Sequence, residues 1–156
     1  MRLCEGGARV YDDHPGSKGK NITLIGAMSD EGLIASMTFS GSLNTASFLV
    51  FIKQILLPQL WVGAIVAMDN LPVHYAEVAK ALIESVGAMV KFLPPYSPDL
   101  SPIELCWSKL KEILRAAKAR TSDALNEAIT IAVNAITDEH ALNWFNHCGL
   151  FFEPIR

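Results

Sequence analysis

The chain has 156 residues, a formal net charge of −3 at neutral pH and a hydrophobic content of 51%. This length fits one domain, and the mean hydropathy of +0.28 argues against a disordered chain. The slightly acidic balance argues weakly against a nucleic-acid partner. Any DNA contact would therefore have to come from a local group of basic residues.

No targeting or membrane segment is predicted. The longest apolar stretch, residues 48–68, is interrupted by charged, amide and proline residues, so it does not predict a membrane span. The first residues lack the apolar core of a signal peptide. The three cysteines are odd in number and show no CxxC spacing. This favours a reduced, cytoplasmic setting over a disulfide framework or a zinc ribbon.

The N-terminal segment differs from the rest of the chain. Residues 1–20 are rich in glycine and charge without sustained periodicity, and they are interpreted as an extended or loop remnant. The folded domain is expected to cover residues 21–156. Two apolar runs at 21–28 and 33–39 predict a β-hairpin, with a turn longer than two residues.

The remaining elements alternate between strands and helices before the chain becomes helical. In chain order they are a helix from Asn44 or Thr45 to about Leu57, a buried strand at 61–68, a helix at about 73–86, a short strand at 88–93 and three helices at about 102–120, 122–136 and 138–148. This order predicts a mixed α/β sheet with helices on both faces.

A first candidate site residue follows the buried strand. Asp69 stands directly after Met68, at the carboxyl end where α/β sheets bind ligands. The alternative is that Asp69 and Asn70 only cap the next helix or form an Asx turn. His74 opens that helix, either beside a metal or phosphate or as a partly exposed polar residue. Spacing alone leaves both alternatives open.

A second carboxylate follows a proline-rich connector. Residues 92–104 (FLPPYSPDLSPIE) end in Glu104, with 34 residues between it and Asp69. Ser101 and Glu104 have the spacing of a capping box, with Pro102 at the first helical position. A capping role alone would explain the position of Glu104. A metal-binding role is also open, because a carboxylate at a helix N-terminus stays ionised, as a divalent cation requires. Two such acids suit a metal site for phosphodiester chemistry.

A row of basic residues continues from Glu104. Lys111, Arg115 and Lys118 follow it by 7, 11 and 14 residues. Around an ideal helix they lie within about 40° of its direction. The opposite side is the expected buried stripe, formed by Cys106, Leu110, Ile113 and Ala117. The row is either an ordinary solvated face or a track for DNA phosphates.

The other histidines and the tryptophans are expected to have structural roles and no catalytic or metal-binding role. His140 and His147 have no cysteine partner at zinc spacing and are interpreted as surface or packing residues. Trp107 and Trp144 are expected to anchor the core.

Together these segments resemble one family. The match comprises Met68-Asp69-Asn70, His74, residues 92–104 and the following stretch 107–111 (WSKLK). It identifies the chain as similar to DDE transposases of the mariner-like superfamily encoded by bacterial insertion sequences. The resemblance runs from about residue 21 to the C-terminus. It implies an RNase H-like mixed sheet flanked by helices, and metal-dependent DNA strand cleavage and transfer.

The resemblance also implies roles for the residues. Two ions, Mg²⁺ or Mn²⁺, would activate water or a DNA 3′-hydroxyl and stabilise the leaving oxygen. Asp69 and Glu104 map onto the second and third acids of the family's triad, with Asn70, His74 and Ser101 in support. Family members usually carry asparagine in place of Ser101, and both residues are good N-caps.

The first acid of the triad is expected on a strand before the hairpin. The acidic residues before Asn21 are Glu5, Asp12 and Asp13, and none of them lies in an apolar run typical of a strand. Asp12 lies in a turn-like context and is not assigned the role. The sequence therefore predicts that the first strand, its aspartate and the family's N-terminal helix-turn-helix are absent.

The favoured hypothesis is the C-terminal part of an insertion-sequence transposase, inactive alone because the first Asp is missing. Its expected partners are transposon-end DNA and the upstream half of a split transposase, and the family implies a homodimer. The alternative is a non-catalytic RNase H-like module for DNA binding or dimerisation. An RNase H-type hydrolase would need an acid-rich first strand. The expected location is the bacterial cytoplasm, at the nucleoid when DNA is bound.

Overall fold

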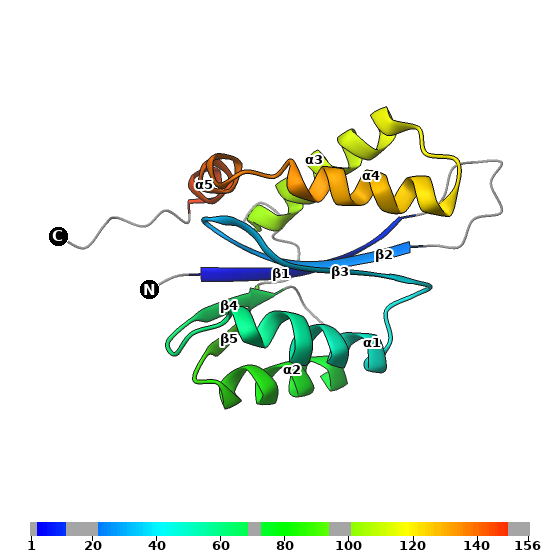
Figure 1. Cartoon of the computed structure of the whole chain (residues 1–156). Coiled ribbons are helices and arrows are strands. Elements are labelled where there is room, and N and C mark those ends of the chain that lie inside the picture. Colours follow the sequence, from blue (N-terminus) through cyan, green and yellow to red (C-terminus); the bar gives the residue numbers. More distant parts are fainter. Residues whose placement is uncertain (1–2, 12–21, 69–72, 94–100, 150–156) are drawn as a thin grey trace.

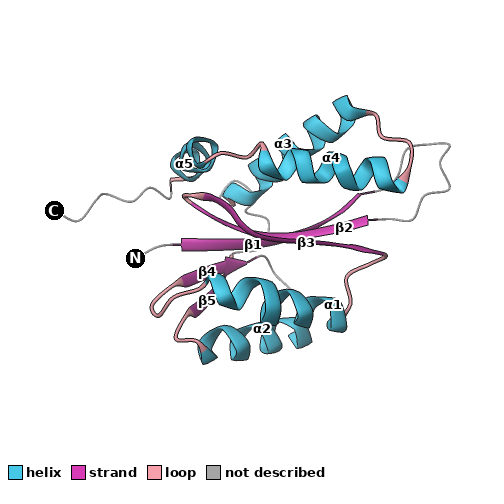
Figure 2. Cartoon of the chain, viewed as in Figure 1, coloured by secondary structure: helices cyan, strands magenta, loops and turns pink. Residues whose placement is uncertain are grey.

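The computed structural model describes four segments of the chain: residues 3–11, 22–68, 73–93 and 101–149. For residues 3–11 and 73–75 only the backbone is described. Five strands form one sheet in the order β3-β2-β1-β4-β5, with helices on both of its faces (Figure 1, Figure 2). The β1–β2 and β2–β3 pairs are antiparallel, whereas β4 and β5 run parallel to β1.

The strands are β1 (Leu3–Tyr11), β2 (Ile22–Ser29), β3 (Gly32–Ser40), β4 (Ile65–Met68) and β5 (Met89–Phe92). On one face lie α1 (Thr45–Val50), the π-helical η1 (Phe51–Leu56), the 3₁₀ turn η2 (Leu57–Gln59) and α2 (Val73–Ser85). On the other face lie α3 (Pro102–Ala117), α4 (Ser122–Asn134) and α5 (Asp138–His147).

The prediction that the first strand is absent is wrong. β1 lies within residues 1–20, the segment expected to be a loop remnant, and it is the central strand of the sheet. It pairs with β2 on one side and with β4 on the other. β2 pairs with residues 5–11 and β4 with residues 3–6, so a segment of glycine and charge adopts a strand despite low intrinsic propensity. The folded unit therefore begins at β1 and not at residue 21.

β2 is covered on both faces, and all eight of its residues are buried. Ile22, Leu24 and Met28 belong to the core beneath α3, α4 and α5. Ile25 and Ala27 belong to the core beneath α1, η1 and α2. This alternation with a period of two divides the protein into two hydrophobic layers around one sheet.

The hairpin between β2 and β3 is tighter than predicted. Ser29 pairs with Gly32, which leaves only Asp30 and Glu31 in the connection. The Ser29 hydroxyl accepts a hydrogen bond from the Glu31 amide at 3.1 Å. Gly32 has a φ of +131°, a backbone conformation that favours glycine.

Three helices begin at a residue whose side chain caps them, and the predicted start at Asn44 is confirmed. Asn44 accepts a hydrogen bond from the Ser47 amide, and Thr121 caps α4 in the same way. Thr137 caps α5 and forms a reciprocal capping box with His140, whose Nδ1 accepts from the Thr137 amide at 3.2 Å. His140 is thus a capping residue, a role that its spacing from a threonine would have indicated.

The helix predicted from Asn44 to about Leu57 changes pitch along its length, passing from α1 through η1 to η2. None of the helices in the described segments combines the length and the apolar character that crossing a bilayer requires.

The end of α2 is held by a glycine in the left-handed conformation. Gly87 has a φ of +82°, and its amide donates to the Glu84 carbonyl at 3.0 Å. The Ala88 amide donates to the Ile83 carbonyl, which completes a Schellman motif. A Cβ atom at position 87 would lie 3.1 Å from a methyl group of Val62.

We therefore expect Gly87→Ala to lower the free energy of unfolding by about 1–2 kcal/mol from backbone strain, and by more because of the contact with Val62. Gly41→Ala is the matched control, because Gly41 has a φ of +88° and a Cβ atom there would have no neighbour within 4 Å. Urea unfolding measures both variants. Equal losses would show that the contact with Val62 contributes nothing.

Candidate active site

The candidate site lies where β4 ends and α3 begins. β4 ends at Met68, whose carbonyl accepts a hydrogen bond from the Leu93 amide at 2.8 Å. Asp69 and Asn70 follow immediately but lie outside the described residues. His74 is the second residue of α2, and only its backbone is described. Ala67 is buried and, by strand alternation with Met68, faces the α3 layer.

Trp107 fixes the position of α3 on the sheet. Its side chain is fully buried, and its Cη2 atom would lie 3.1 Å from a Cβ atom added to Gly26. Gly26 pairs with Gly7 of β1, and the preceding β1 residue, Gly6, pairs with Met68. Two strand spacings span about 10 Å. The first turns of α3 therefore lie close to the carboxyl end of β4. The core role predicted for Trp107 is confirmed.

Glu104 stands in the first turn of α3 and is half-buried. Ser101 is the N-cap residue, but its side chain makes no capping hydrogen bond to α3, so this part of the expected capping box is wrong. The backbone explains the difference. Ser101 has a ψ of 98°, whereas Asn44, Thr121 and Thr137, whose side chains do cap, have ψ values between 160° and 174°.

The buried face of α3 is not opposite Glu104. It consists of Pro102, Ile103, Cys106, Trp107, Leu110 and Leu114. At 100° per residue this face is centred about a third of a turn from Glu104. Glu104 and Lys111 therefore lie at its margin, and both are half-buried. The predicted burial is confirmed at Cys106 and Leu110 and is wrong at Ala117, which is exposed.

The predicted basic row is only partly helical. Lys111 and Arg115 lie within α3, on the side of Glu104. Lys118 is the C-cap residue, with a φ of +50°, so helical spacing does not give the direction of its side chain. Arg115 and Lys118 are exposed. A phosphate track along this row stays a prediction.

The described residues do not form a complete metal centre. Among the side chains that the structure describes, which leave out residues 3–11 and 73–75, no group of three His, Cys, Asp or Glu could hold an ion. Glu104 is the member of the predicted acid pair that lies within these segments. β1 carries a single acid, Glu5, whose Cα partner on β4 is Ala67. Carboxylate oxygens are the ligands that Mg²⁺ and Mn²⁺ prefer, so the chemistry of the predicted pair fits these ions.

The comparisons with known proteins agree with this geometry. A family model described as DDE superfamily endonuclease matches residues 3–126, from β1 into α4. The chain belongs to this family, which comprises DDE-type transposase catalytic domains that cleave and transfer DNA. The search among curated proteins gave no match.

Solved structures show the same RNase H-like fold. The catalytic domain of Mos1 mariner transposase has a TM-score of 0.73 and 17% identity, covering 94% of this chain and 76% of that one. Its complex with Raltegravir and Mg has a TM-score of 0.74 and 18% identity, covering 94% and 78%. The Mos1 paired-end complex with the left transposon end has a TM-score of 0.72 and 19% identity, covering 94% and 52%. The chain thus spans about half of the Mos1 chain in that complex.

The contact between Trp107 and Gly26 makes a testable prediction for the placement of α3. Gly26→Ala should destabilise the protein, because its Cβ atom would lie 3.1 Å from the indole and 3.2 Å from the Ala35 carbonyl. Trp107→Phe removes Cη2, so the double variant should lose less stability than the two single losses added together. A double-mutant cycle by urea unfolding measures this coupling. Strict additivity would contradict the proposed contact.

Cys106 is predicted to be chemically inert. Burial raises the pKa of its thiol to about 12, which leaves almost no thiolate at pH 8. In a Cys4→Ser, Cys148→Ser background, a thiol reagent at pH 8 should label the folded protein slowly and the urea-unfolded protein fast. Because the unfolded thiol has a pKa near 9.0, stability should fall as pH rises from about 9 to 12. Equal labelling of both states would overturn the prediction.

Proposed function

We propose that this chain carries the second and third acids of a DDE transposase centre. It binds transposon-end DNA and does not cleave DNA on its own. The observation that carries the proposal is the placement of Glu104 at the start of α3, with Trp107 anchoring that helix over the strands beside the end of β4. Membership of the DDE superfamily gives the reaction class.

Asp69 and Glu104 are the proposed metal ligands, with Asn70 and His74 in support. When bound, Mg²⁺ or Mn²⁺ would activate a water or DNA 3′-hydroxyl and stabilise the leaving oxygen. Ser101 ends the connector and starts the helix that presents Glu104. The half-buried position of Glu104 limits the motion of its carboxylate.

The absence of activity follows from the composition of β1. A two-ion centre needs a carboxylate that bridges the ions as well as one on each side. The β1 residue that pairs with Met68 is Gly6, and the next is Gly7, so neither has a side chain to bind an ion. Glu5 lies one residue earlier, beside Ala67. We infer that the missing acid comes from another segment, such as the upstream half of a split insertion-sequence transposase.

Partners and location are part of the same proposal. Mos1 transposase is seen with a transposon end and in a strand transfer complex. The present chain is proposed to bind transposon-end DNA through Lys111, Arg115 and Lys118, to act as a homodimer and to work at the bacterial nucleoid. The alternative, a non-catalytic DNA-binding module, is favoured by the composition of β1. It predicts binding that Asp69→Ala and Glu104→Ala leave unchanged.

The first test is a cleavage assay on labelled transposon-end DNA with Mg²⁺ or Mn²⁺. The purified chain should neither nick nor join the DNA, because two carboxylates do not hold both ions. Adding the upstream segment should produce activity that Asp69→Asn and Glu104→Gln each abolish. Cleavage by the chain alone, lost in Asp69→Asn, would refute the proposed incompleteness.

The second test concerns the basic row. Reversing the charge of Lys111, Arg115 and Lys118 together should weaken DNA binding at least tenfold and reduce its salt dependence. The control is Lys53→Glu with Lys80→Glu, two exposed lysines in the α1 and α2 layer. Thermal unfolding verifies that each variant folds. Unchanged, still salt-sensitive binding would exclude this row as the DNA contact.

A further inference from the structure

β3 is an edge strand of unusual composition. It has nine residues, and within the described sheet only one of its sides is paired, by β2. The strand contains no charged residue and no proline. Charge, proline and short length are the usual protections of an edge strand against pairing with another chain. The opposite edge, β5, is protected by its length of four residues. β3 has none of these protections after the bulge near its start.

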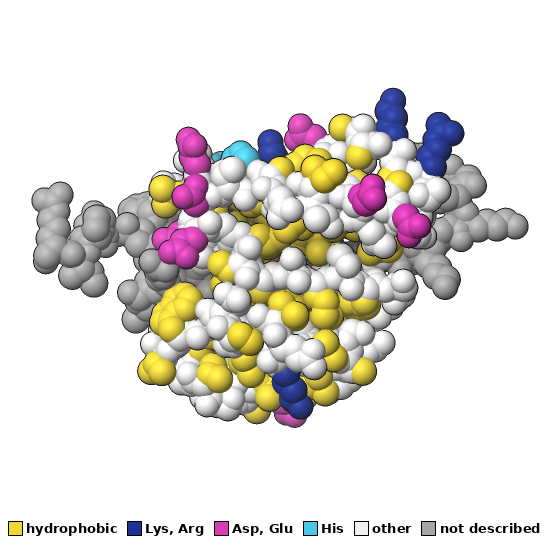
Figure 3. Space-filling view, in the orientation of Figure 1, with side chains coloured by type: hydrophobic (Ala, Val, Ile, Leu, Met, Phe, Trp, Pro, Cys, Tyr) yellow, Lys and Arg dark blue, Asp and Glu magenta, His cyan; other side chains and the backbone are white. Residues whose placement is uncertain are grey.

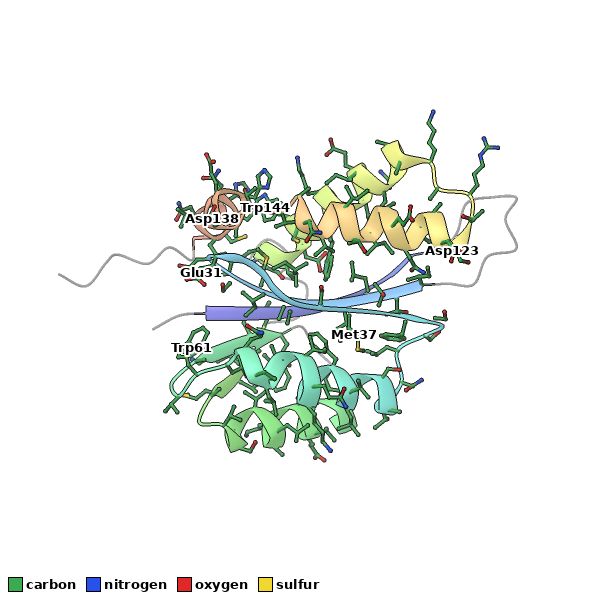
Figure 4. All side chains as sticks on the ribbon, in the orientation of Figure 1. Glu31, Met37, Trp61, Asp123, Asp138 and Trp144 are labelled. Atoms are coloured by element: carbon green, nitrogen blue, oxygen red, sulfur yellow. The ribbon has the colours of Figure 1, made fainter. Side chains whose placement is uncertain are left out.

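The surface around β3 has the pattern of an interface. Figure 3 looks onto this edge and shows hydrophobic and neutral side chains across its centre, with acidic side chains toward both ends. Figure 4 labels Met37 within this band, between the two helical layers. An uncharged centre within a charged rim is the usual anatomy of a protein–protein contact. The band does not resemble a DNA-binding face, because its centre is uncharged and its rim carries acids as well as cations.

A cavity of about 310 Å³ runs along the same edge, between β3 and α4. Its polar lining comes from Ser36 and Thr38 of β3 and from Asn126, Thr130 and Asn134 of α4. The cavity lies three strands from β4 in the sheet order, so it is separate from the acid pair. Its lining holds no ionisable group, which disfavours a charged small ligand.

The polar lining is self-complementary. Asn126, Thr130 and Asn134 are spaced by four residues, so the row on α4 has the same order of side chains in both directions. A twofold axis perpendicular to the sheet at Met37 would pair two β3 strands antiparallel. It would place Ser36 opposite Thr38 of the second copy, on the same face of the sheet. An isologous contact requires this kind of self-matching.

The charged residues of the rim are also partly complementary between two copies. Lys118 and Arg120 precede α4, and Asp138 and Glu139 begin the helix that follows it. In an antiparallel arrangement the cations of one copy face these acids of the other. Asp123, in the first turn of α4, opposes the attraction. The expected association is therefore reversible and dependent on concentration.

We propose that β3 and α4 form the contact between two copies of this chain, joining their sheets edge to edge through antiparallel β3 strands. The proposal gives the contact of the homodimer that is part of the proposed function. It is argued from the edge strand, the neutral lining and its symmetry, and it does not depend on the acid pair. An extended basic peptide could be drawn to the same acidic rim, and the experiment below separates it from a second copy.

Sedimentation velocity of the full chain over a range of concentrations should show a monomer and a species of twice the 17.0 kDa chain mass. Thr38→Lys and Thr130→Lys, both at exposed positions, should weaken the dimer at least tenfold by placing like charges across the axis. Ala81→Lys adds the same charge on the exposed side of α2 and should leave the dimer unchanged. Circular dichroism confirms that each variant folds.

A cysteine at position 37 tests the register. Directly opposed Cα atoms in an antiparallel pair lie about 4.5–5.5 Å apart, within the range of a disulfide. In a Cys4→Ser, Cys148→Ser background, Met37→Cys should form a covalent dimer on mild oxidation, whereas Ala81→Cys should not. A chain that stays monomeric at high concentration, a dimer unaffected by Thr38→Lys, or equal cross-linking at both positions would overturn the proposal. If the chain binds a basic peptide but forms no dimer, the β3 edge is a site for an extended basic peptide and not for a second copy.

Discussion

The placement of Trp107 against the backbone of Gly26 is the contact on which the site depends. The end of the indole reaches the sheet backbone here because Gly26 has no side chain; a Cβ atom at this position would lie 3.1 Å from Cη2. The fully buried indole then fixes the height and direction of α3, and Glu104 stands one helical turn before it. Because Gly26 is connected through β1 to the end of β4, one packing contact sets the relation between two carboxylate-bearing segments distant in sequence.

Much of this arrangement was predictable from the sequence. Local signals such as Asn44, Thr121 and Thr137 give the helix starts, because a capping side chain acts on amides two or three residues away. Glu104 was correctly placed in the first turn of a helix, since Pro102 and the hydrophobic spacing define that start. The Pro-rich connector and Asp69 identified the family that the family model shows.

The errors arose where distant contacts decide the structure. β1 has glycines in place of an apolar alternation, and pairing with β2 and β4 makes it a strand. Ser101 has a backbone angle that directs its side chain away from capping. Lys118 has a left-handed conformation that ends α3 earlier than predicted. Helical periodicity describes none of these three features, because each depends on a backbone conformation set by its surroundings.

The central claim is that the chain supplies two thirds of a two-ion centre. The most direct measurement is the number of Mn²⁺ ions bound per chain, by electron paramagnetic resonance titration of the free metal. The account predicts at most one weakly bound ion, lost in both Asp69→Asn and Glu104→Gln. Two tightly bound ions per chain would contradict it, because they would require a third carboxylate of this chain, such as Glu5, to bind the ions together with Asp69 and Glu104.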